Sequence, residues 1–498
     1  MIPDNNHTNP FDKITGSASL ANPRGLLIFF IGVSLLAIIL AKLEIAGVGL
    51  VLALMFGAVF LNMLFKNPIL GFYTAIGLNF VLLGSLRYIT TELPIGFAID
   101  GIMTITFLAL IFQKFRERVD WSPAKSFVIV LAAVWLGYFV FQLVNPEARM
   151  IEPWIAGRGV GFYFLFFAIL TLMLINTNKR LDTFLYVWGV FSILGTLKGI
   201  GQLIFGPDYA EQAWLDSGAS ITHVLFGKLR IFSFYSDAGQ FGGNQGYAGV
   251  VFIIYGMVKK GWSKVFFLTV GILGIYGMLI SGTRGSIAVP FAGFMTFFVL
   301  RKNVKVMGAG ILLVVLMFVF FKYTMIGNGN AQIRRMRTGF DPNNPSLIVR
   351  KNNQKKLAAY LASRPFGGGV GHAGDKAQRF LPHAFLSNVA TDSWYVMIWA
   401  EMGIIGLSLH LFILFTIMGV VSFKVMFRIL DPITKLKMSA LISGVAGIMA
   451  ASYGNGVLGQ NPTSLLIYAS FALMSNQKIF ERPIEEIEEI EEPKLMPA

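Results

Sequence analysis

The sequence predicts an all-α fold: a polytopic membrane bundle of about 12–14 transmembrane helices with a long, partly helical loop on its outer face. The first observation is composition, since 55% of the 498 residues are hydrophobic and only 13% are charged, against roughly 25% charged residues in a soluble domain. The second is that apolar runs long enough to cross a bilayer recur along the chain. The third is that Lys and Arg concentrate in the short stretches between these runs.

The apolar runs, taken in chain order, define the expected helices. Each is close to the roughly 20 residues that a membrane-spanning helix needs. The tight turn at Lys42–Gly47 leaves open whether the first two runs form a single re-entrant element. The expected spans are 25–42, 46–64, 67–86, 97–112, 126–143, 161–176, 183–204, 242–258, 264–281, 285–300, 306–322, 394–421, 437–454 and 461–476.

The short loops indicate the orientation, because Lys and Arg accumulate in loops that stay in the cytoplasm. Basic loops alternate with less basic ones along the chain, which places both chain ends in the cytoplasm. The basic loops contain Lys66; Lys114, Arg116 and Arg118; Lys179 and Arg180; Lys259, Lys260 and Lys264; Arg301, Lys302 and Lys305; and Lys424, Arg428, Lys435 and Lys437.

The chain is therefore expected to divide into five parts. They are a cytoplasmic segment at 1–24, a transmembrane bundle with outer loops at 25–322, a long periplasmic loop at 323–393, the C-terminal transmembrane helices at 394–476, and an acidic cytoplasmic tail at 477–498. The repeating I-E-E pattern of the tail is typical of a solvated segment that needs no further role.

Composition also excludes several kinds of site. The chain has no Cys, so disulfides, thiolate catalysis and Cys-based metal sites are absent. None of the five His belongs to an H-E-x-x-H or H-x₃-H pair, so neither a metal nor a cofactor is expected. The net charge of +15 is scattered between membrane spans, which argues against a nucleic-acid partner.

The long outer loop carries an unusual excess of positive charge. Between Thr324 and Thr391 there are ten Lys or Arg and only two acids, Asp341 and Asp375. Long loops escape the charge bias of short ones, but a basic surface on the outer face favours an anionic ligand. Lipid phosphates and pyrophosphates are the expected ligands.

Two other polar clusters fall on the same face. Arg230 and Asp237 lie in the segment 229–242 that enters a span, which is either a simple polar entry loop or a functional site. Arg284 lies in the Ser281–Ser286 hairpin, which is too short to project it far from the membrane. Snorkelling to lipid phosphate is the alternative, but we expect Arg284 to face a hydrated cavity.

The end of the long loop adds a third cluster. The glycine-rich run 364–372 lacks the G-K-[ST] ending of a phosphate loop, so we expect a tight turn, although its amides could still bind an anion. Asp392 stands at the outer start of a span, where capping of the helix by Thr391 or Asp392 and catalysis by Asp392 are equally plausible.

Together these clusters resemble the O-antigen ligase and polymerase superfamily, the lipid-linked oligosaccharide transferases of the bacterial envelope. Members have an Arg in an outer loop before a span, an S-G-S-R-G-type hairpin, and a long outer loop. That loop has an Arg-led amphipathic stretch, a P-x-x-G-x-G turn and a helix entry ending in E-x-G-[IL]-[IL]-G. The resemblance covers about Gly227 to Leu407, and the matching positions are Arg230, Ser281–Ser286, Arg350–Leu361, Pro365–Gly371 and Asp392–Gly406.

The resemblance implies a GT-C-like fold in the bacterial inner membrane, with the outer loops in the periplasm. It implies an inverting, metal-independent enzyme that moves a glycan from undecaprenyl pyrophosphate to an acceptor hydroxyl. Arg230, Arg284 and Arg350 would bind the pyrophosphate, because guanidinium groups form bidentate hydrogen bonds to phosphate. The partners would be this lipid-linked donor, a lipid, glycan or protein acceptor, and membrane lipids.

One position departs from the family pattern, which usually has His where this chain has Asp392. Asp can also act as a general base, and a carboxylate paired with Arg stays ionised. We therefore expect Asp392 to act on the acceptor, and His383 to assist if the loop folds inward. Asp237, His372 and Glu401 are expected to support the site.

Two other classes of function remain open from the sequence. A lipid-linked oligosaccharide flippase or other transporter would need charged residues near the middle of the membrane and paired broken helices, whereas the conspicuous charges lie on one face. A purely structural envelope-assembly protein is the other alternative. The sugar and the acceptor are left open.

Overall fold

The computed structural model describes residues 52–89, 96–113, 120–225, 227–329, 331–341 and 344–482. The chain separates into two units, residues 1–67 and 68–498. In the first unit the described element is the apolar helix Leu52–Lys66. The predicted segment 1–24, the predicted span 25–42 and the acidic tail from residue 483 lie outside the described residues.

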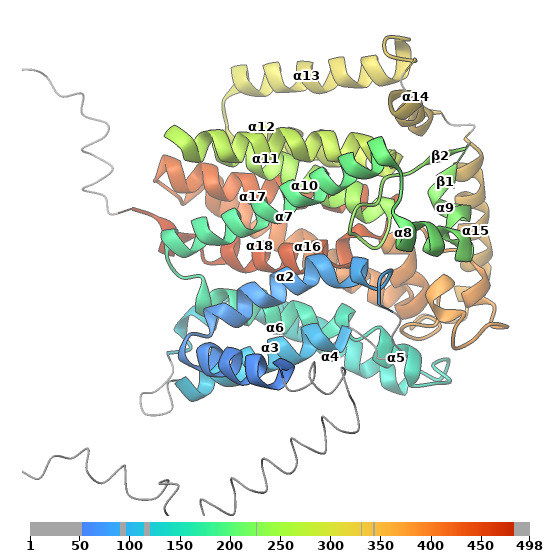
Figure 1. The fold of residues 1–498 in the computed structure, drawn as a ribbon, viewed down its shortest axis with the longest axis horizontal. Helices are drawn as coiled ribbons and strands as arrows, with labels where there is room; N and C mark the ends of the chain where they lie inside the picture. Colours follow the sequence, from blue (N-terminus) through green and yellow to red (C-terminus); the bar gives the residue numbers. More distant parts are fainter. Residues whose placement is uncertain are drawn as a thin grey trace, which may run out of the picture. The chain divides into compact units, whose positions relative to one another are not determined.

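The second unit is built almost entirely of helices (Figure 1). A short antiparallel hairpin pairs β1 with β2. The elements are α2 (Ile69–Ser85), α3 (Gly96–Gln113), α4 (Phe127–Phe141), α5 (Glu152–Ala156), α6 (Gly159–Leu174), α7 (Asn178–Phe205), α8 (Tyr209–Trp214), α9 (Ser220–His223), β1 (Val224–Leu225), β2 (Lys228–Leu229), α10 (Ala238–Gly256), α11 (Gly261–Ile280), α12 (Ala288–Leu300), α13 (Val304–Tyr323), α14 (Ala331–Arg337), α15 (Pro345–Leu361), α16 (Trp394–Phe427), α17 (Pro432–Ala451) and α18 (Thr463–Ser475).

Short helical turns connect several of these helices. They are η1 (Ser122–Ala124), η2 (Gln142–Val144), η3 (Leu215–Ala219), η4 (Arg284–Ile287), η5 (Thr338–Phe340), η6 (Asp375–Ala377), η7 (Leu386–Asn388), η8 (Val457–Gly459) and η9 (Gln477–Phe480).

The predicted all-α membrane fold is confirmed. Each predicted span between residues 67 and 476 coincides with a helix. Among the described residues, six helices are long and apolar enough to cross a membrane, and shorter apolar helices accompany them. The six are Phe127–Val144, Glu152–Leu174, Asn178–Phe205, Gly261–Ile280, Trp394–Phe427 and Pro432–Ala451.

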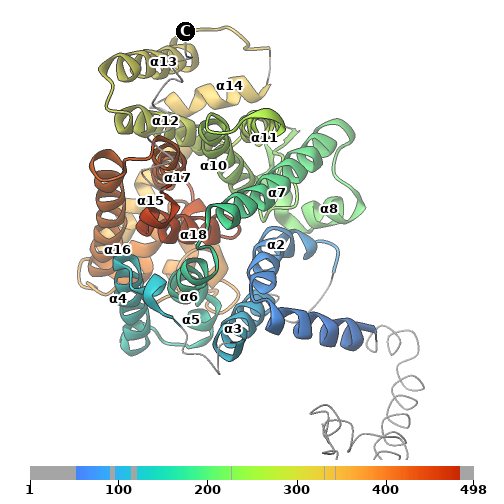
Figure 2. The ribbon, with the colours of Figure 1, turned by 90° about the vertical axis from the view of Figure 1, so that its left-hand side faces the viewer.

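Helix α10 forms the centre of the bundle, and Figure 2 shows it among α7, α11, α12 and α17. All of its residues except Ile253 are buried. Its small residues allow neighbouring backbones to approach closely, since a methyl group on Gly274 of α11 would lie 2.8 Å from the backbone nitrogen of Gly249. Close contacts of this kind are common between helices in membranes.

Polar side chains inside α10 are satisfied by neighbouring helices. Asn244 donates to the Thr463 hydroxyl at 3.1 Å, and Gln245 accepts a hydrogen bond from the Ser192 hydroxyl at 2.8 Å. Buried amides must find partners where water is excluded. These bonds fix α10 against α18 and α7, and thereby fix the position of its N-terminus.

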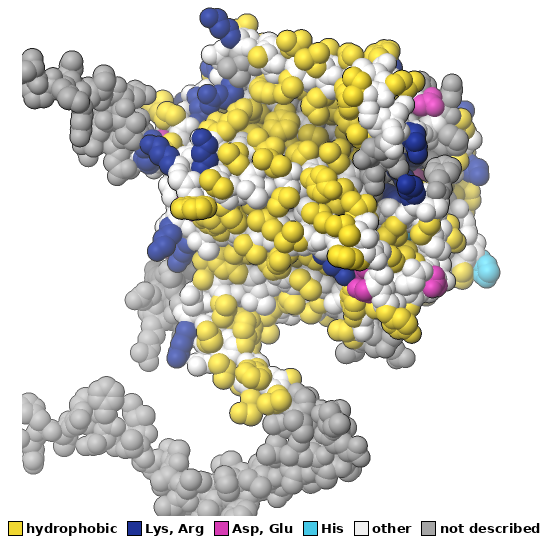
Figure 3. All heavy atoms as spheres, turned by 45° about the horizontal axis from the view of Figure 1, so that its top comes forward, with side chains coloured by type: hydrophobic (Ala, Val, Ile, Leu, Met, Phe, Trp, Pro, Cys, Tyr) yellow, Lys and Arg dark blue, Asp and Glu magenta, His cyan; other side chains and the backbone are white. Residues whose placement is uncertain are grey.

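The surface of the second unit has an apolar belt with charge at its edges. Figure 3 shows a broad hydrophobic area with Lys and Arg gathered toward two opposite ends. Large exposed apolar side chains include Phe415, Ile272 and Leu316. Such a large apolar surface is expected where a protein faces lipid. At one end lie α8, α9, the β hairpin, α14 and α15 (Figure 1).

Candidate functional site

Arg230 follows strand β2 and reaches the hairpin between α11 and η4. Its Nη1 donates to the Thr222 carbonyl and its Nη2 to the Thr283 hydroxyl, each at 3.0 Å. Its Nε is buried without a hydrogen-bond partner among the described residues. Burial lowers the pKa of Arg230, and the nearby Asp237 carboxylate opposes this shift.

The loop that carries Arg230 is held by an arginine that we did not single out from the sequence. The guanidinium of Arg87 lies 4.4 Å from the ring centroids of both Trp214 and Phe232. It also donates to the carbonyls of Ser233 and Ser236 at 3.0 Å. Arg87 therefore fixes the course of the loop.

Arg284 begins η4, directly after the tight turn of the hairpin. Gly282 has a φ of +60°, a backbone conformation that favours glycine. The Ser281 hydroxyl accepts a hydrogen bond from the Thr283 amide at 3.1 Å and closes the turn. Arg284 donates from Nη1 to the Thr338 hydroxyl at 3.3 Å, which links the hairpin to the end of α14.

Arg335 in α14 is the main residue that the sequence interpretation missed. Met336 is fully buried in a cluster with Ile287 and Phe321, and this anchors α14 over the hairpin. A methyl group on Gly282 would lie 3.3 Å from Cδ of Arg335. Arg335 Nε is buried without a hydrogen-bond partner among the described residues.

Arg335 is also electrostatically crowded. Burial, together with the positive charges of Arg230 and Arg284, lowers the pKa of Arg335 to about 10. Bringing like charges together costs free energy, which an anion bound between them would offset. In the sequence, the run R-R-x-R at 334–337 indicates a basic segment but not which side chain turns inward.

Arg350 is placed by the docking of α15. Leu357 and Leu361, about two and three turns further along the same face, are buried in a cluster with Leu386 and Val389. Arg350 Nε donates to Asp392 Oδ2 at 3.1 Å, and the two side chains are 37% and 51% exposed. The Arg350 charge also acts on Arg284.

Asp392 is not a helix cap, so the capping interpretation is wrong. The N-cap residue of α16 is Ser393, and it makes no side-chain capping bond. Instead the Trp394 amide donates to the carbonyls of Ser452 and Asn455 at 3.1 and 3.2 Å. The start of α16 is thus held by the loop after α17, and the Asp392 carboxylate is left to pair with Arg350.

Asp237, by contrast, is the N-cap of α10. Its Oδ1 accepts hydrogen bonds from the amides of Gly239 and Gln240 at 2.7 and 3.0 Å. This satisfies two amides that a helix start leaves unpaired. Asp237 therefore supports Arg230 from a distance by its charge while it fixes the end of α10.

The glycine-rich run and Glu401 form a structural joint. The amides of Gly368 and Gly369 donate to the carbonyls of Ala400 and Glu401 at 2.9 Å. The buried Glu401 side chain accepts from the amides of Gly371 and Ala373. These amides are bonded within the protein, so the structure favours the turn over the alternative that they bind an anion.

This joint coincides with a kink in α16 at Gly403, where φ is +70° and ψ is −173°. A methyl group on Gly403 would lie 2.0 Å from the Pro365 carbonyl oxygen, and one on Gly367 would lie 2.4 Å from the Gly403 nitrogen. Two backbones therefore touch directly. The contact sets the position of the loop that leads to Asp392.

The two loop histidines have different environments. His372 is buried, its Nδ1 lies 2.9 Å from the Val370 carbonyl, and burial lowers its pKa. His383 is exposed. Within the described part of the chain, no hydrogen bond joins either ring to Asp392.

The site therefore gathers arginines from separate elements at one end of the bundle. Arg230, Arg284 and Arg335 lie around the hairpin, and Arg350 connects them to Asp392. Such an arrangement can bind a multiply charged anion next to a carboxylate.

Comparison with known proteins gives one match. Residues 267–411 match a family model described as O-antigen ligase. The matched part runs from α11 into α16 and includes Arg284, Arg335, Arg350 and Asp392, whereas Arg230 lies before it. No curated protein and no solved structure matches the chain.

Proposed function

We propose that this chain, a member of the O-antigen ligase family through residues 267–411, is an integral membrane glycosyltransferase that moves a glycan from undecaprenyl pyrophosphate to an acceptor hydroxyl. The observation that carries the proposal is the convergence of Arg230, Arg284, Arg335 and Arg350 beside Asp392. The family supports a ligase or polymerase type of reaction, and the site supports the finer assignment of donor and mechanism.

The arginine cluster would bind the pyrophosphate of the donor. When the glycosidic bond breaks, negative charge develops on the leaving phosphate. Guanidinium groups fixed in place before the reaction stabilise that charge most effectively. Because the buried Nε groups of Arg230 and Arg335 lack protein partners among the described residues, they are suited to donate to phosphate oxygens. The fixed cations supply this charge without a metal ion.

Asp392 would accept the proton of the acceptor hydroxyl. The hydroxyl oxygen attacks the anomeric carbon from the face opposite the pyrophosphate, the bond between that carbon and the phosphate oxygen breaks, and the configuration inverts. The proton passes to Asp392, and undecaprenyl pyrophosphate leaves with the bonding electrons. Arg350 would orient the carboxylate through the hydrogen bond at 3.1 Å.

The charge of the short loops supports a periplasmic position for this site and a cytoplasmic position for both chain ends, in a bacterial inner membrane. His383 remains a candidate for assistance from the loop. The acceptor is a lipid, a glycan or a protein hydroxyl. A flippase would need charged residues within the membrane. The arginine cluster lies at one end of the bundle, which argues against this alternative.

The test uses the purified full-length protein and the undecaprenyl-linked glycan that accumulates in cells lacking it. Incubation with an acceptor extract should convert the donor to free undecaprenyl pyrophosphate and a glycan product of increased mass. Arg284→Ala should abolish this conversion at unchanged protein level. Lipid-linked glycan that accumulates on the inner leaflet of the deletion strain, with no transfer by the purified protein, would instead support a flippase.

A further inference from the structure

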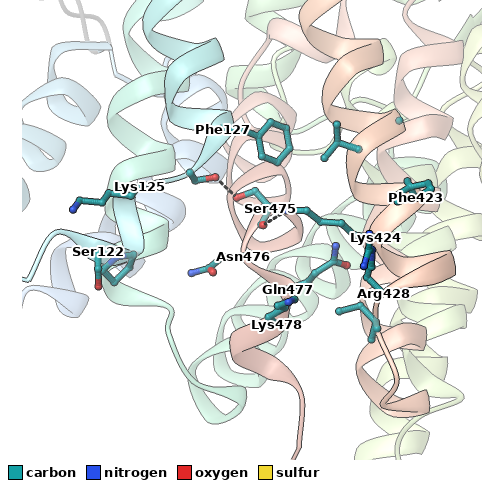
Figure 4. A pocket seen from close by; sticks show the side chains of 15 residues that line it. Ser122, Lys125, Phe127, Phe423, Lys424, Arg428, Ser475, Asn476, Gln477 and Lys478 are labelled. Carbon is teal, nitrogen blue, oxygen red and sulfur yellow. Dashed lines mark hydrogen bonds between the residues drawn. The ribbon is translucent and has the colours of Figure 1, made fainter.

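A cavity lies at the opposite end of the bundle from the arginine cluster. It has a volume of about 770 Å³ and opens between the start of α4, the end of α16 and η9 (Figure 4). Helix α16 connects the two ends, since Asp392 precedes its first residue and Arg428 follows its last. From the kink at Gly403 to Phe427 the helix rises roughly 36 Å. The cavity is therefore separate from the proposed transferase site.

Positive charge surrounds this cavity. Lys424, Arg428 and Lys478 line it, with Lys125 near its rim. Lys424 extends from α16 toward Ser475, whose carbonyl it reaches at 3.4 Å (Figure 4). Lys424 and Lys478 are close enough to repel each other.

These cations are not neutralised by the part of the chain that the structure describes. None of the four forms an ion pair with a described acidic side chain. Asp120, two residues before the lining residue Ser122, accepts hydrogen bonds from the amide and hydroxyl of Ser122 at 2.9 Å. The cavity thus has the charge of an anion site.

Gln477 gives a second, independent indication of a ligand. It lines the cavity and is only 1% exposed. Neither its amide nitrogen nor its amide oxygen has a hydrogen-bond partner among the described residues. Leaving a buried amide unpaired is costly, so a polar ligand at this position would satisfy it.

The cavity also has an apolar wall. Phe127, Val420 and Phe423 line it together with Gly419. Phe423 is 53% exposed and its ring lies 5.0 Å from that of Phe427, which is 56% exposed. These rings continue the apolar surface of α16 that faces lipid. A ligand here would have an anionic head beside an aromatic, lipid-facing wall.

We propose that this cavity binds the phosphodiester headgroup of an anionic phospholipid. Lys424, Arg428 and Lys478 would contact the phosphate, Gln477 would hydrogen-bond to the headgroup, and an acyl chain would lie along Phe423. Basic pockets between membrane helices favour such lipids. Free phosphate could bind the same cationic residues as the headgroup, but it would make no contact with the apolar wall. The site is independent of the transferase activity.

The test measures lipid retention by native mass spectrometry and lipid-induced thermal stabilisation of the full-length protein, delipidated in detergent. Phosphatidylglycerol should bind and raise the melting temperature, whereas phosphatidylcholine and inorganic phosphate at the same concentration should not. The double variant K424Q/R428Q should weaken phosphatidylglycerol binding by roughly 30-fold, as expected for two charges near a lipid phosphate. K260Q/K264Q removes two exposed charges at the start of α11 and should leave binding unchanged.

A second variant keeps every charge. A methyl group on Gly419 would meet nothing within 4 Å, so Gly419→Leu fills open space in the cavity and favours the helix. It should fold normally and lose phosphatidylglycerol binding. Retention by both variants at the wild-type level would overturn the proposal, as would equal binding of phosphatidylcholine. Stabilisation by inorganic phosphate alone would overturn the lipid assignment.

Discussion

Arg350 donates its Nε–H to Oδ2 of Asp392 at 3.1 Å, and this bond joins the surface helix α15 to the residue that precedes α16. The pair lies at the edge of the arginine cluster, and both side chains are partly exposed. A surface ion pair of this kind contributes little to stability, roughly 0–1 kcal/mol. We therefore expect the Arg350–Asp392 pair to matter for the proposed reaction, in which it would orient the carboxylate beside the bound pyrophosphate.

The first prediction concerns Asp392. Asp392→Asn keeps the shape of the side chain but removes the base, so we expect glycan transfer to fall by roughly 10²–10⁴-fold with little change in melting temperature. Asp375→Asn is the matched control, because Asp375 is an exposed carboxylate of the same loop. Turnover is measured as lipid-linked donor consumed. An Asp392→Asn variant with the wild-type rate would rule out the role of base.

The second prediction compares two neighbouring arginines. Arg335 is held against the hairpin and crowded by Arg230 and Arg284, whereas Arg334 is exposed and donates to the Asn328 carbonyl at 3.2 Å. A hydrogen bond to a charged group contributes about 1.5–3 kcal/mol. Arg335→Ala should therefore weaken donor binding by roughly 10–100-fold, and Arg334→Ala should have little effect.

Binding of the lipid-linked donor to the two variants is measured by titration, at low and at high salt. If Arg335 contacts pyrophosphate, the salt dependence should be smaller in Arg335→Ala than in Arg334→Ala, because one fewer ionic contact remains. Equal losses in the two variants would mean that only the total charge of α14 matters.

The fold was largely predictable from the sequence, and the site only in part. In lipid, an apolar run of about 20 residues can pair its own backbone N–H and C=O groups by forming a helix. The positions of the helices therefore follow from the positions of the apolar runs. The inward position of Arg335 depends on Met336 docking against Phe321, which no local pattern reveals. Asp237 and Glu401 look like site residues in the sequence, but their partners are backbone amides.

The third prediction concerns the joint between the glycine-rich run and α16. Gly403 has a conformation that is essentially restricted to glycine, and a methyl group there would lie 2.0 Å from the Pro365 carbonyl oxygen. Gly403→Ala should lower the melting temperature by more than about 5 °C, since strain of this kind costs roughly 1–3 kcal/mol before the clash is added.

Gly419→Ala is its control, because Gly419 lies in the same helix and a methyl group there meets nothing within 4 Å. That variant should be unchanged or slightly more stable. The measurement is thermal unfolding followed by size-exclusion chromatography in detergent. Equal stability of the two variants would show that the contact with Pro365 does not hold the loop.

The last prediction concerns pH and His372. Burial lowers the pKa of this ring below its ordinary value of 6.5. The ring therefore binds a proton less readily in the folded protein than in the unfolded chain. Below about pH 6.5 the unfolded chain gains a proton at His372 that the folded protein does not, so the free energy of unfolding decreases as the pH falls toward the folded pKa. The wild type should lose about 1–2 °C more in melting temperature between pH 7.5 and 5.5 than His372→Leu, since one titrating group contributes at most about 1.4 kcal/mol over this range. His383→Leu replaces the exposed histidine of the same loop and should keep the wild-type pH profile. If His372→Leu also keeps that profile, the buried ring does not resist protonation, and its environment must admit water.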